Sequence, residues 1–233
     1  MTKPARALRG AAAMAALSLA ACGSDIDTPF RLSLAPLESV DVGWPAGSPC
    51  PEVLEKTHGP ADGYSYAHGR GCIQRSLAEV WEALQLPQVA HLSFWPERDE
   101  STCSAKLNFQ VDGVTGYSVS FEHHETPKGI GSFADFYVVF VEGVTKRSAA
   151  GPEEVVVAYQ KTSGHSYIPV LRGTVLLEEI STGVTGVELV RHLKTLHSGR
   201  DDGAQAELWI QGYFDALKMQ VYGPPVPAVC ALH

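Results

Sequence analysis

The sequence predicts an α+β domain in which one antiparallel sheet packs against a long C-terminal helix. Three observations predict it: a first strand followed at once by a short amphipathic helix, six further strand-like runs separated by short turns, and a final helical segment of about twenty residues. Connections this short join antiparallel neighbours, because parallel strands need crossovers of a dozen or more residues. We therefore expect a seven-stranded antiparallel sheet, and not a series of βαβ units.

The first strand and the short helix lie next to each other in the chain. The stretch Gly63–Gln74, GYSYAHGRGCIQ, is predicted to be the first strand, although its glycines weaken strand character. Ser76 and Glu79 then form an S-x-x-E capping box, and Leu77, Val80, Trp81 and Leu84 make one apolar stripe. Pro87 ends this helix, and 88–95 (QVAHLSFW) is a second short helix or a turn.

The rest of the domain alternates strand-like runs with turn signals such as DGVTG, PKGIG, SAAGP and STG. The segment DDGAQAELWIQGYFDALKMQVY, Asp201–Tyr222, is predicted to be the long helix, because it opens on acidic residues and ends at GPP. The six strand-like runs are 103–111, 116–126, 132–144, 153–163, 168–180 and 183–196.

The N-terminus has the pattern of a secretory signal. Lys3, Arg6 and Arg9 precede an apolar run that is too short to span a bilayer permanently, and no acidic residue precedes Cys22. The sequence LAAC at 19–22 resembles a bacterial lipobox, which would make Cys22 the lipidated first residue of the mature protein; ordinary signal cleavage is the alternative. Gly23 follows, and the absence of Asp there favours the outer membrane in a Gram-negative cell.

Charge excludes some partners. Removal of residues 1–21 takes three cations from the 18 Lys and Arg and leaves the 26 Asp and Glu, so the mature chain has a net charge of −11. Binding to nucleic acid depends on cations that neutralise phosphates, and such a partner is therefore not expected. Attraction to anionic lipid is equally unsupported, so the membrane would be reached through the acyl chains.

The sequence divides into four parts. Residues 1–21 are the signal peptide, 22–62 a lipidated tether, 63–223 the domain and 224–233 a C-terminal tail. The tether is rich in Pro, Gly, Ser and acidic residues. If it is flexible throughout, its 40 or so residues span about 35 Å. Its short apolar runs, such as FRLSLAPL at 30–37, offer a way to dock on the domain surface.

Four cysteines remain after Cys22, and an exported compartment permits disulfides. Four cysteines allow three connectivities. We favour Cys72 with Cys103 and Cys50 with Cys230. A zinc site is not expected, because no two of these cysteines have the two-to-four-residue spacing usual in such sites.

The order of elements, together with the segment SLAEVWEAL at 76–84, resembles the helix-grip fold of the START-like (SRPBCC) superfamily. The resemblance covers 63–223. It implies a curved sheet wrapped around the long helix, with a cavity between them for an apolar ligand such as a lipid, a sterol or a polyketide. The paired cysteines, the long tether and the glycine-rich first strand depart from the family's pattern.

The two-residue period of strands identifies inward side chains. Tyr117, Val119 and Phe121 form one apolar set, which brings His123 to the same face, and Arg191 falls among the apolar inward residues of 187–193. On the long helix, Trp209 and Tyr213 share a stripe. The candidate ligand-binding residues are therefore His123, Arg191, Tyr117, Phe121, Tyr213 and Trp209. The alternative is that His123 and Arg191 lie near strand ends and reach water or a carboxylate, and that Tyr213 is a core aromatic whose hydroxyl is satisfied.

No catalytic constellation is readable. The adjacent histidines of EHHE at 122–125 point to opposite faces of a strand, and GHSYI at 164–168 lacks the last glycine of a nucleophile elbow. We expect no metal and no cofactor. The predicted function is a membrane-anchored lipoprotein whose domain binds or carries a hydrophobic small molecule in the cell envelope. An enzyme of the cyclase or hydrolase type, or a structural protein-interaction domain without a cavity, is the alternative.

Overall fold

The computed structural model describes residues 34–37, 50–85, 102–111, 114–125, 132–149, 151–164, 166–196 and 201–223. For 102–111, 114–125 and 132–137 it describes the backbone and its pairing. The predicted signal peptide, Cys22, the second short helix at 88–95 and Cys230 lie outside these residues.

Within the described residues one antiparallel sheet has the order β1-β2-β8-β7-β6-β5-β4-β3. All neighbours along this sheet except β2 and β8 are consecutive in the chain, and β8 returns to pair with β2. The elements are β1 Glu55–Ala61, β2 Tyr64–Ile73, α1 Leu77–Leu84, β3 Thr102–Val111, β4 Val114–Glu125, β5 Ser132–Ser148, β6 Gly151–Gly164, β7 Val170–Ser181, β8 Val184–Lys194 and α3 Asp202–Tyr222.

The α+β class, the seven predicted strands and both helices that fall in the described residues are confirmed. The strand count is wrong by one, because β1 lies in the segment predicted as tether. β1 and β2 form a hairpin around Asp62 and Gly63, with Ala61 paired to Tyr64 and Gly63 at φ 80°. Asp-Gly is a strong signal for a two-residue hairpin turn. β1 was missed because EKTHGPA does not alternate apolar and polar residues.

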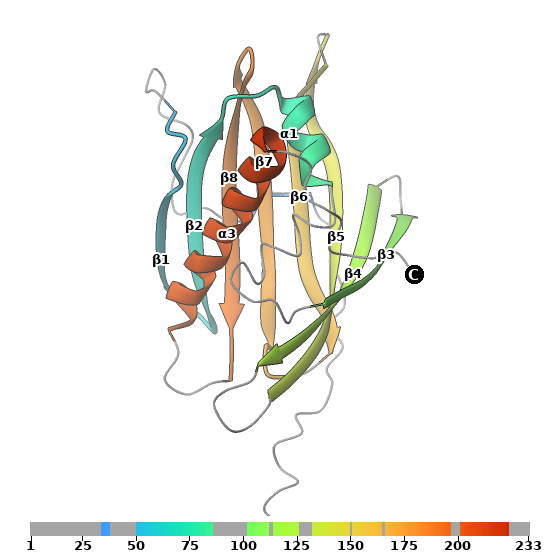
Figure 1. Ribbon diagram of the computed structural model, residues 1–233, viewed down its shortest axis with the longest axis vertical. Coiled ribbons are helices and arrows are strands. Elements are labelled where there is room, and N and C mark those ends of the chain that lie inside the picture. Colours follow the sequence, from blue (N-terminus) through green and yellow to red (C-terminus); the bar gives the residue numbers. More distant parts are fainter. Residues whose placement is uncertain are drawn as a thin grey trace, which may run out of the picture.

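The glycines of β2 allow α3 to lie close to the sheet. α3 packs against β1, β2 and β8, and Figure 1 shows it crossing these strands on one side of the sheet. A Cβ on Gly71 would lie 2.7 Å from Cζ of Phe214, and a Cβ on Gly69 would lie 3.0 Å from Cδ1 of Ile210. The residues that weaken β2 as a strand are therefore those that let the helix approach its backbone.

The short helix α1 covers the end of the sheet beside the C-terminal part of α3 (Figure 1). Its predicted capping box is confirmed: Ser76 Oγ accepts from the backbone N–H of Glu79, and the Glu79 carboxylate accepts from the backbone N–H of Ser76. Trp81 and Gln85 donate to the carboxylate of Glu142 on β5, at 3.3 and 3.0 Å. α1 thus ties β5 to the helical side of the sheet.

Cys50 forms a disulfide with Cys72, with 5.6 Å between their Cα atoms, so the favoured pairing of Cys72 with Cys103 and Cys50 with Cys230 is wrong. The hairpin explains the difference. Because β1 pairs with β2, the residues before β1 return to the far end of β2, where the backbone N–H of Cys72 donates to the carbonyl of Pro51.

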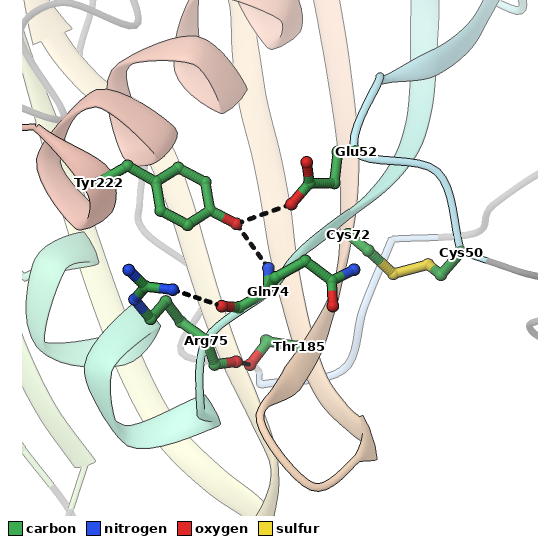
Figure 2. The surroundings of a disulfide bond; sticks show 7 residues. All are labelled: Cys50, Glu52, Cys72, Gln74, Arg75, Thr185 and Tyr222. Atoms are coloured by element: carbon green, nitrogen blue, oxygen red, sulfur yellow. Dashed lines mark hydrogen bonds between the residues drawn. A yellow bond between two sulfur atoms is a disulfide. The ribbon is translucent and has the colours of Figure 1, made fainter.

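The disulfide lies next to the C-terminal end of α3 (Figure 2). The Tyr222 hydroxyl accepts from the backbone N–H of Gln74 at 2.6 Å and donates to the carboxylate of Glu52 at 3.1 Å, and Lys218 donates to the Glu52 carbonyl. The guanidinium of Arg75 lies 4.9 Å from the centre of the Tyr222 ring. Residues 50–52 are therefore fixed to β2 and to α3.

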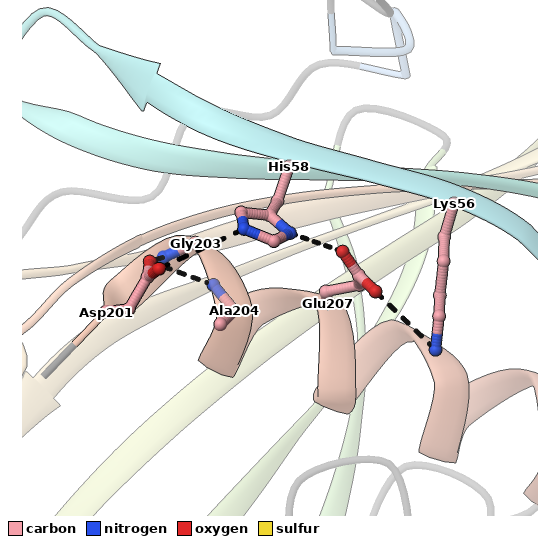
Figure 3. A network of polar contacts seen from close by, with 6 residues as sticks. All are labelled: Lys56, His58, Asp201, Gly203, Ala204 and Glu207. Carbon is pink, nitrogen blue, oxygen red and sulfur yellow. Dashed lines mark hydrogen bonds and ion pairs between the residues drawn. The ribbon is translucent and has the colours of Figure 1, made fainter.

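The other end of α3 is held by β1 (Figure 3). Asp201 caps the helix by accepting from the backbone N–H groups of Gly203 and Ala204. His58 on β1 lies between Asp201 and Glu207 and bonds to the Glu207 carboxylate. Gly203 leaves space for its ring, since a Cβ there would lie 2.8 Å from Cδ2 of His58.

Candidate functional site

Three residues on neighbouring strands form the base of the candidate site. Tyr159 on β6 is paired with Gly173 on β7, and Gly173 is paired with Arg191 on β8. Residues that pair directly across strands share one face of a sheet. This face, called the inner face below, is the one covered by α3, because Arg191 contacts Trp209 of that helix.

Gly173 has no side chain, and the space above it is where Tyr159 and Arg191 make contact. A Cβ on Gly173 would lie 2.2 Å from the Tyr159 hydroxyl and 2.3 Å from Cζ of its ring. Only glycine at this position lets the tyrosine lie flat across β7 toward the arginine. Arg191 Nε then donates a hydrogen bond of 2.6 Å to that hydroxyl.

Arg191 is fully buried, with a relative exposure of 0%. Its guanidinium carbon lies 5.1 Å from the centre of the Tyr159 ring and 5.2 Å from the centre of the Trp209 ring. A guanidinium stays protonated in proteins, so this position holds a permanent positive charge in the core. Aromatic faces and a phenol oxygen stabilise that charge.

Tyr213 of α3 adds a second phenol. It is buried, and its hydroxyl has no hydrogen-bond partner among the described residues. A buried hydroxyl without a partner costs about 1–3 kcal/mol. Its position one helical turn after Trp209 places it on the same stripe of α3.

Both phenols are held in their neutral form. Burial raises the pKa of Tyr213, and Tyr159 and Glu142 raise it further, while Arg191 opposes them. Burial also raises the pKa of Tyr159, against the opposing effect of the Arg191 charge and hydrogen bond. At neutral pH the two hydroxyls are therefore hydrogen-bonding groups and not bases.

The surroundings of these polar groups are apolar. Inner-face side chains of the central strands pack with α1 and α3 into one buried cluster, which includes Phe140, Val157, Val175, Leu189, Leu193, Ile210, Phe214 and Leu217. The ring centres of Phe140 and Tyr159 lie 5.5 Å apart. The arrangement is a small set of polar groups inside an apolar shell, which is typical of sites for small apolar ligands.

Three of the six predicted ligand-binding residues are brought together, namely Arg191, Trp209 and Tyr213. Tyr117 is paired with Phe140, so by backbone register it belongs to the same cross-strand row as Tyr159 and Arg191. The side chains of β4 are outside the described residues.

Phe121 and His123 lie further along β4, paired with Phe136 and Ala134. His123 is six residues from Tyr117, or about 20 Å along the strand. The register therefore separates the position of His123 from the row that contains Arg191.

Tyr159 was not predicted from the sequence. It ends the run VVVAY, whose residues Val155–Tyr159 are buried on both faces of the sheet. A strand that is apolar on both faces gives no alternation from which to select one inward residue. Gly173, at the middle of IPVLRGTVLLEEI, was the available signal, because a glycine inside a strand indicates close approach by another group.

Within the part of the chain that the structure describes, no helix is long and apolar enough to cross a membrane. Among the same residues, no group of three or more His, Cys, Asp and Glu side chains is placed to hold a metal ion.

No family model and no curated protein sequence matches the chain. Solved structures that it resembles include the human StarD13 (DLC2) lipid transfer and protein localization domain, at 8% identity and a TM-score of 0.49 over 78% of this chain and 88% of that one. The Zhui aromatase/cyclase from Streptomyces sp. R1128 has 12% identity and a TM-score of 0.41, over 72% and 94%. Human STARD10 has 10% identity and a TM-score of 0.43, over 71% and 73%. At these scores the likeness carries no inference about ligand or activity.

Proposed function

We propose that this protein is an exported lipoprotein, anchored through Cys22, whose domain binds a hydrophobic small molecule between the inner face of the sheet and α3. The apolar body of the ligand contacts the buried cluster. A polar acceptor on the ligand, such as a carbonyl, carboxylate or phosphate oxygen, faces Tyr213 and Arg191.

The observation that carries the proposal is the Tyr213 hydroxyl, which is buried beside a permanent charge and has no partner among the described residues. A ligand oxygen would accept a hydrogen bond from this hydroxyl and remove the penalty of the unmade hydrogen bond. Arg191 on the opposite wall adds a charge that strengthens hydrogen bonds to an anionic or strongly polar acceptor.

Binding is favoured over catalysis by the same groups. A general base has to be deprotonated at the working pH, and burial raises the pKa of both phenols away from that state. Two neutral hydroxyls and one guanidinium can hold and orient a polar group, which is what carriage of a lipid-like molecule needs.

The anchor rests on the sequence of the N-terminus, where a basic segment, an apolar run and LAAC precede Gly23. Metabolic labelling with an alkyne analogue of palmitate should mark the wild-type protein and should not mark Cys22→Ser. Equal labelling of the two would remove Cys22 as the site.

The test of ligand binding is native mass spectrometry, with lipid extraction, of protein purified from its own envelope. Wild-type protein should carry an extractable apolar molecule. Tyr213→Phe and Arg191→Met should each lower its retention at least about tenfold, the effect expected for loss of one good hydrogen bond to a ligand. Tyr64→Phe makes the same chemical change on the opposite face of the sheet and serves as the control.

Stability separates loss of the site from loss of the fold. Tyr213→Phe removes a hydroxyl without a partner, so the ligand-free protein should be as stable as wild type or more stable by about 1 kcal/mol. Retention unchanged in both Tyr213→Phe and Arg191→Met, with both variants folded, would contradict the proposed site.

A further inference from the structure

Part of the face of the sheet opposite α3, called the outer face below, is also buried. Val141 on β5 and Val156 on β6 have a relative exposure of 0%, Thr174 on β7 has 3%, and Ala158 between them is buried as well. These residues alternate with the inner-face residues Phe140, Tyr159 and Gly173 and therefore point away from α3 and α1. Because α1 and α3 cover the inner face only, they do not explain why these outer-face side chains are buried.

One described segment lies on this face. The backbone N–H of Leu37 donates a hydrogen bond of 3.1 Å to Oγ1 of Thr174. A Cβ on Gly143 of β5 would lie 2.5 Å from Cδ1 of Leu34, so the Leu34 side chain occupies the space that Gly143 leaves open. Leu34 and Leu37 are both partly buried.

The two contacts fix the path of this segment. Gly143 is paired with Val156, and Thr174 is paired with Ala158, so the contacts lie on the two strands that flank β6. Two interstrand spacings are about 9.6 Å, and three extended residues span about 10 Å. Leu34–Leu37 therefore crosses β6 from β5 to β7, over Val156 and Ala158.

We propose that the outer face of β5, β6 and β7 is a docking surface for the chain's own segment Leu34–Leu37. The occupant suits the surface, because two partly buried leucines lie over valines and alanine, and Thr174 beneath them accepts from the backbone N–H of Leu37. Gly143 makes the contact close, as a side chain there would exclude Leu34.

The docking changes the length of the tether. With Leu34–Leu37 bound to β5–β7 and Cys50 bonded to Cys72, the chain is fixed to the domain at two points before β1 begins. The leash, which is the 11 residues 23–33 between Cys22 and Leu34, then limits the distance from the lipid to the docked segment to about 40 Å, against about 90 Å for the chain from Cys22 to Cys50. The shortening of the leash rests on the proposed lipid anchor at Cys22. A short leash would hold the outer face of the sheet toward the bilayer.

Hydrogen–deuterium exchange of the full mature chain, read at the Leu37 amide by NMR, tests the docking without reference to ligand or anchor. The wild-type amide should exchange at least about 100-fold more slowly than in an unstructured peptide. Thr174→Val removes the acceptor and Gly143→Leu fills the Leu34 position, and each should speed exchange at least about tenfold. Leu34→Ser should do the same, and Leu208→Ser on the exposed side of α3 is its matched control.

Thr174→Val and Gly143→Leu change the sheet and can prevent folding. Leu34→Ser lies outside the sheet, so it still tests the docking if those two variants do not fold. Exchange of the wild-type amide at the unstructured rate, or rates unchanged in Leu34→Ser and Thr174→Val, would overturn the proposal. Protection that appears only with dimer formation in analytical ultracentrifugation would also overturn it, since the occupant would then be the segment of a second copy.

Neutron reflectometry on a supported bilayer tests the leash separately. The lipidated wild-type domain should lie about 10 Å closer to the bilayer than lipidated Gly143→Leu, in which the attachment of Leu34–Leu37 is lost and that of Cys50 remains. Equal separations with a protected Leu37 amide would overturn the leash and leave the docking intact. Absence of lipid on Cys22 would contradict the proposed anchor and leave the exchange result as it stands.

Discussion

The two faces of the sheet bury positive charge by different means. On the inner face, Arg191 is stabilised by the rings of Tyr159 and Trp209 and by one phenol oxygen. On the outer face, Arg70 and His68 of β2 meet a buried carboxylate, Glu188 of β8, at 2.9 and 3.1 Å. The outer group is an ion cluster closed by its own carboxylate. The inner group joins a charge to aromatic rings beside the Tyr213 hydroxyl, which has no hydrogen-bond partner among the described residues.

The difference separates a structural role from a binding role. A buried ion cluster fixes the register of β2 on β8, because a slip of one residue would bring Arg70 and Glu188 to opposite faces. A charge on aromatic rings does not need a specific carboxylate position. We expect the outer cluster to matter for stability and the inner cluster for ligand retention.

The largest expected effect is on the outer cluster. Glu188→Ala leaves Arg70 and His68 without the carboxylate and should lower the free energy of unfolding by about 3–5 kcal/mol. Arg191→Met removes the inner charge and keeps an unbranched apolar side chain, and should change the free energy of unfolding by less than about 1.5 kcal/mol. Urea denaturation measures both, with the exposed Glu179→Ala as a control. Equal losses for the two faces would contradict the division of roles.

The disulfide should come next. Cys50 and Cys72 are separated by 22 residues, and closing a loop of that length stabilises a fold by about 3 kcal/mol. The double variant Cys50→Ala and Cys72→Ala should lose about that amount in urea denaturation, and wild-type protein treated with reductant should match it. A variant as stable as oxidised wild type would show that residues 50–52 are held without the disulfide, by the backbone bond between Cys72 and Pro51 and by the Tyr222 and Lys218 contacts.

A smaller effect is expected from pH on the outer face. Burial, together with the nearby Arg172 charge, lowers the pKa of His192 from 6.5 to about 4, and Arg172 Nε donates to its Nδ1. Between these values the unfolded chain binds a proton that the folded protein does not, so stability falls as pH decreases from 6.5 to about 4. The loss should be at least about 1 kcal/mol. Chemical denaturation at pH 7.5 and pH 4.5 measures it.

His192→Gln removes this titration while keeping an acceptor for Arg172. The variant should lose less stability than wild type over the same pH interval. A pH dependence as steep in the variant as in wild type would assign the effect to other groups.

The smallest effect is expected at the partly exposed contact between β1 and α3. Glu207→Gln breaks the charge interactions with His58 and Lys56, and should cost no more than about 1 kcal/mol because solvent screens them. The difference from wild type should shrink in 1 M NaCl. A larger, salt-independent loss would show that this contact behaves like the buried cluster around Glu188.

Much of the fold could be predicted because its signals are local. The capping box at Ser76, the acidic start of α3 and the turns between strands depend on residues a few positions apart. The face assignment was harder, because β6 and β8 are buried on both sides and do not alternate in a simple way. Arg191 could be predicted because it is a polar residue among apolar inward positions, and Trp209 and Tyr213 because they share one stripe of the predicted helix. Tyr159 could not, because it ends a continuous apolar run.

The sequence by itself determined the α+β class, the element order and three residues of the candidate site, since periodicity and capping are properties of short segments. The tertiary structure decided what depends on residues distant in the chain. It added β1 to the edge of the sheet, paired Cys50 with Cys72, brought Tyr159 to Arg191 across Gly173 and placed Leu34–Leu37 on the outer face. Which distant residues become neighbours depends on strand register and close packing. A local sequence pattern does not specify these.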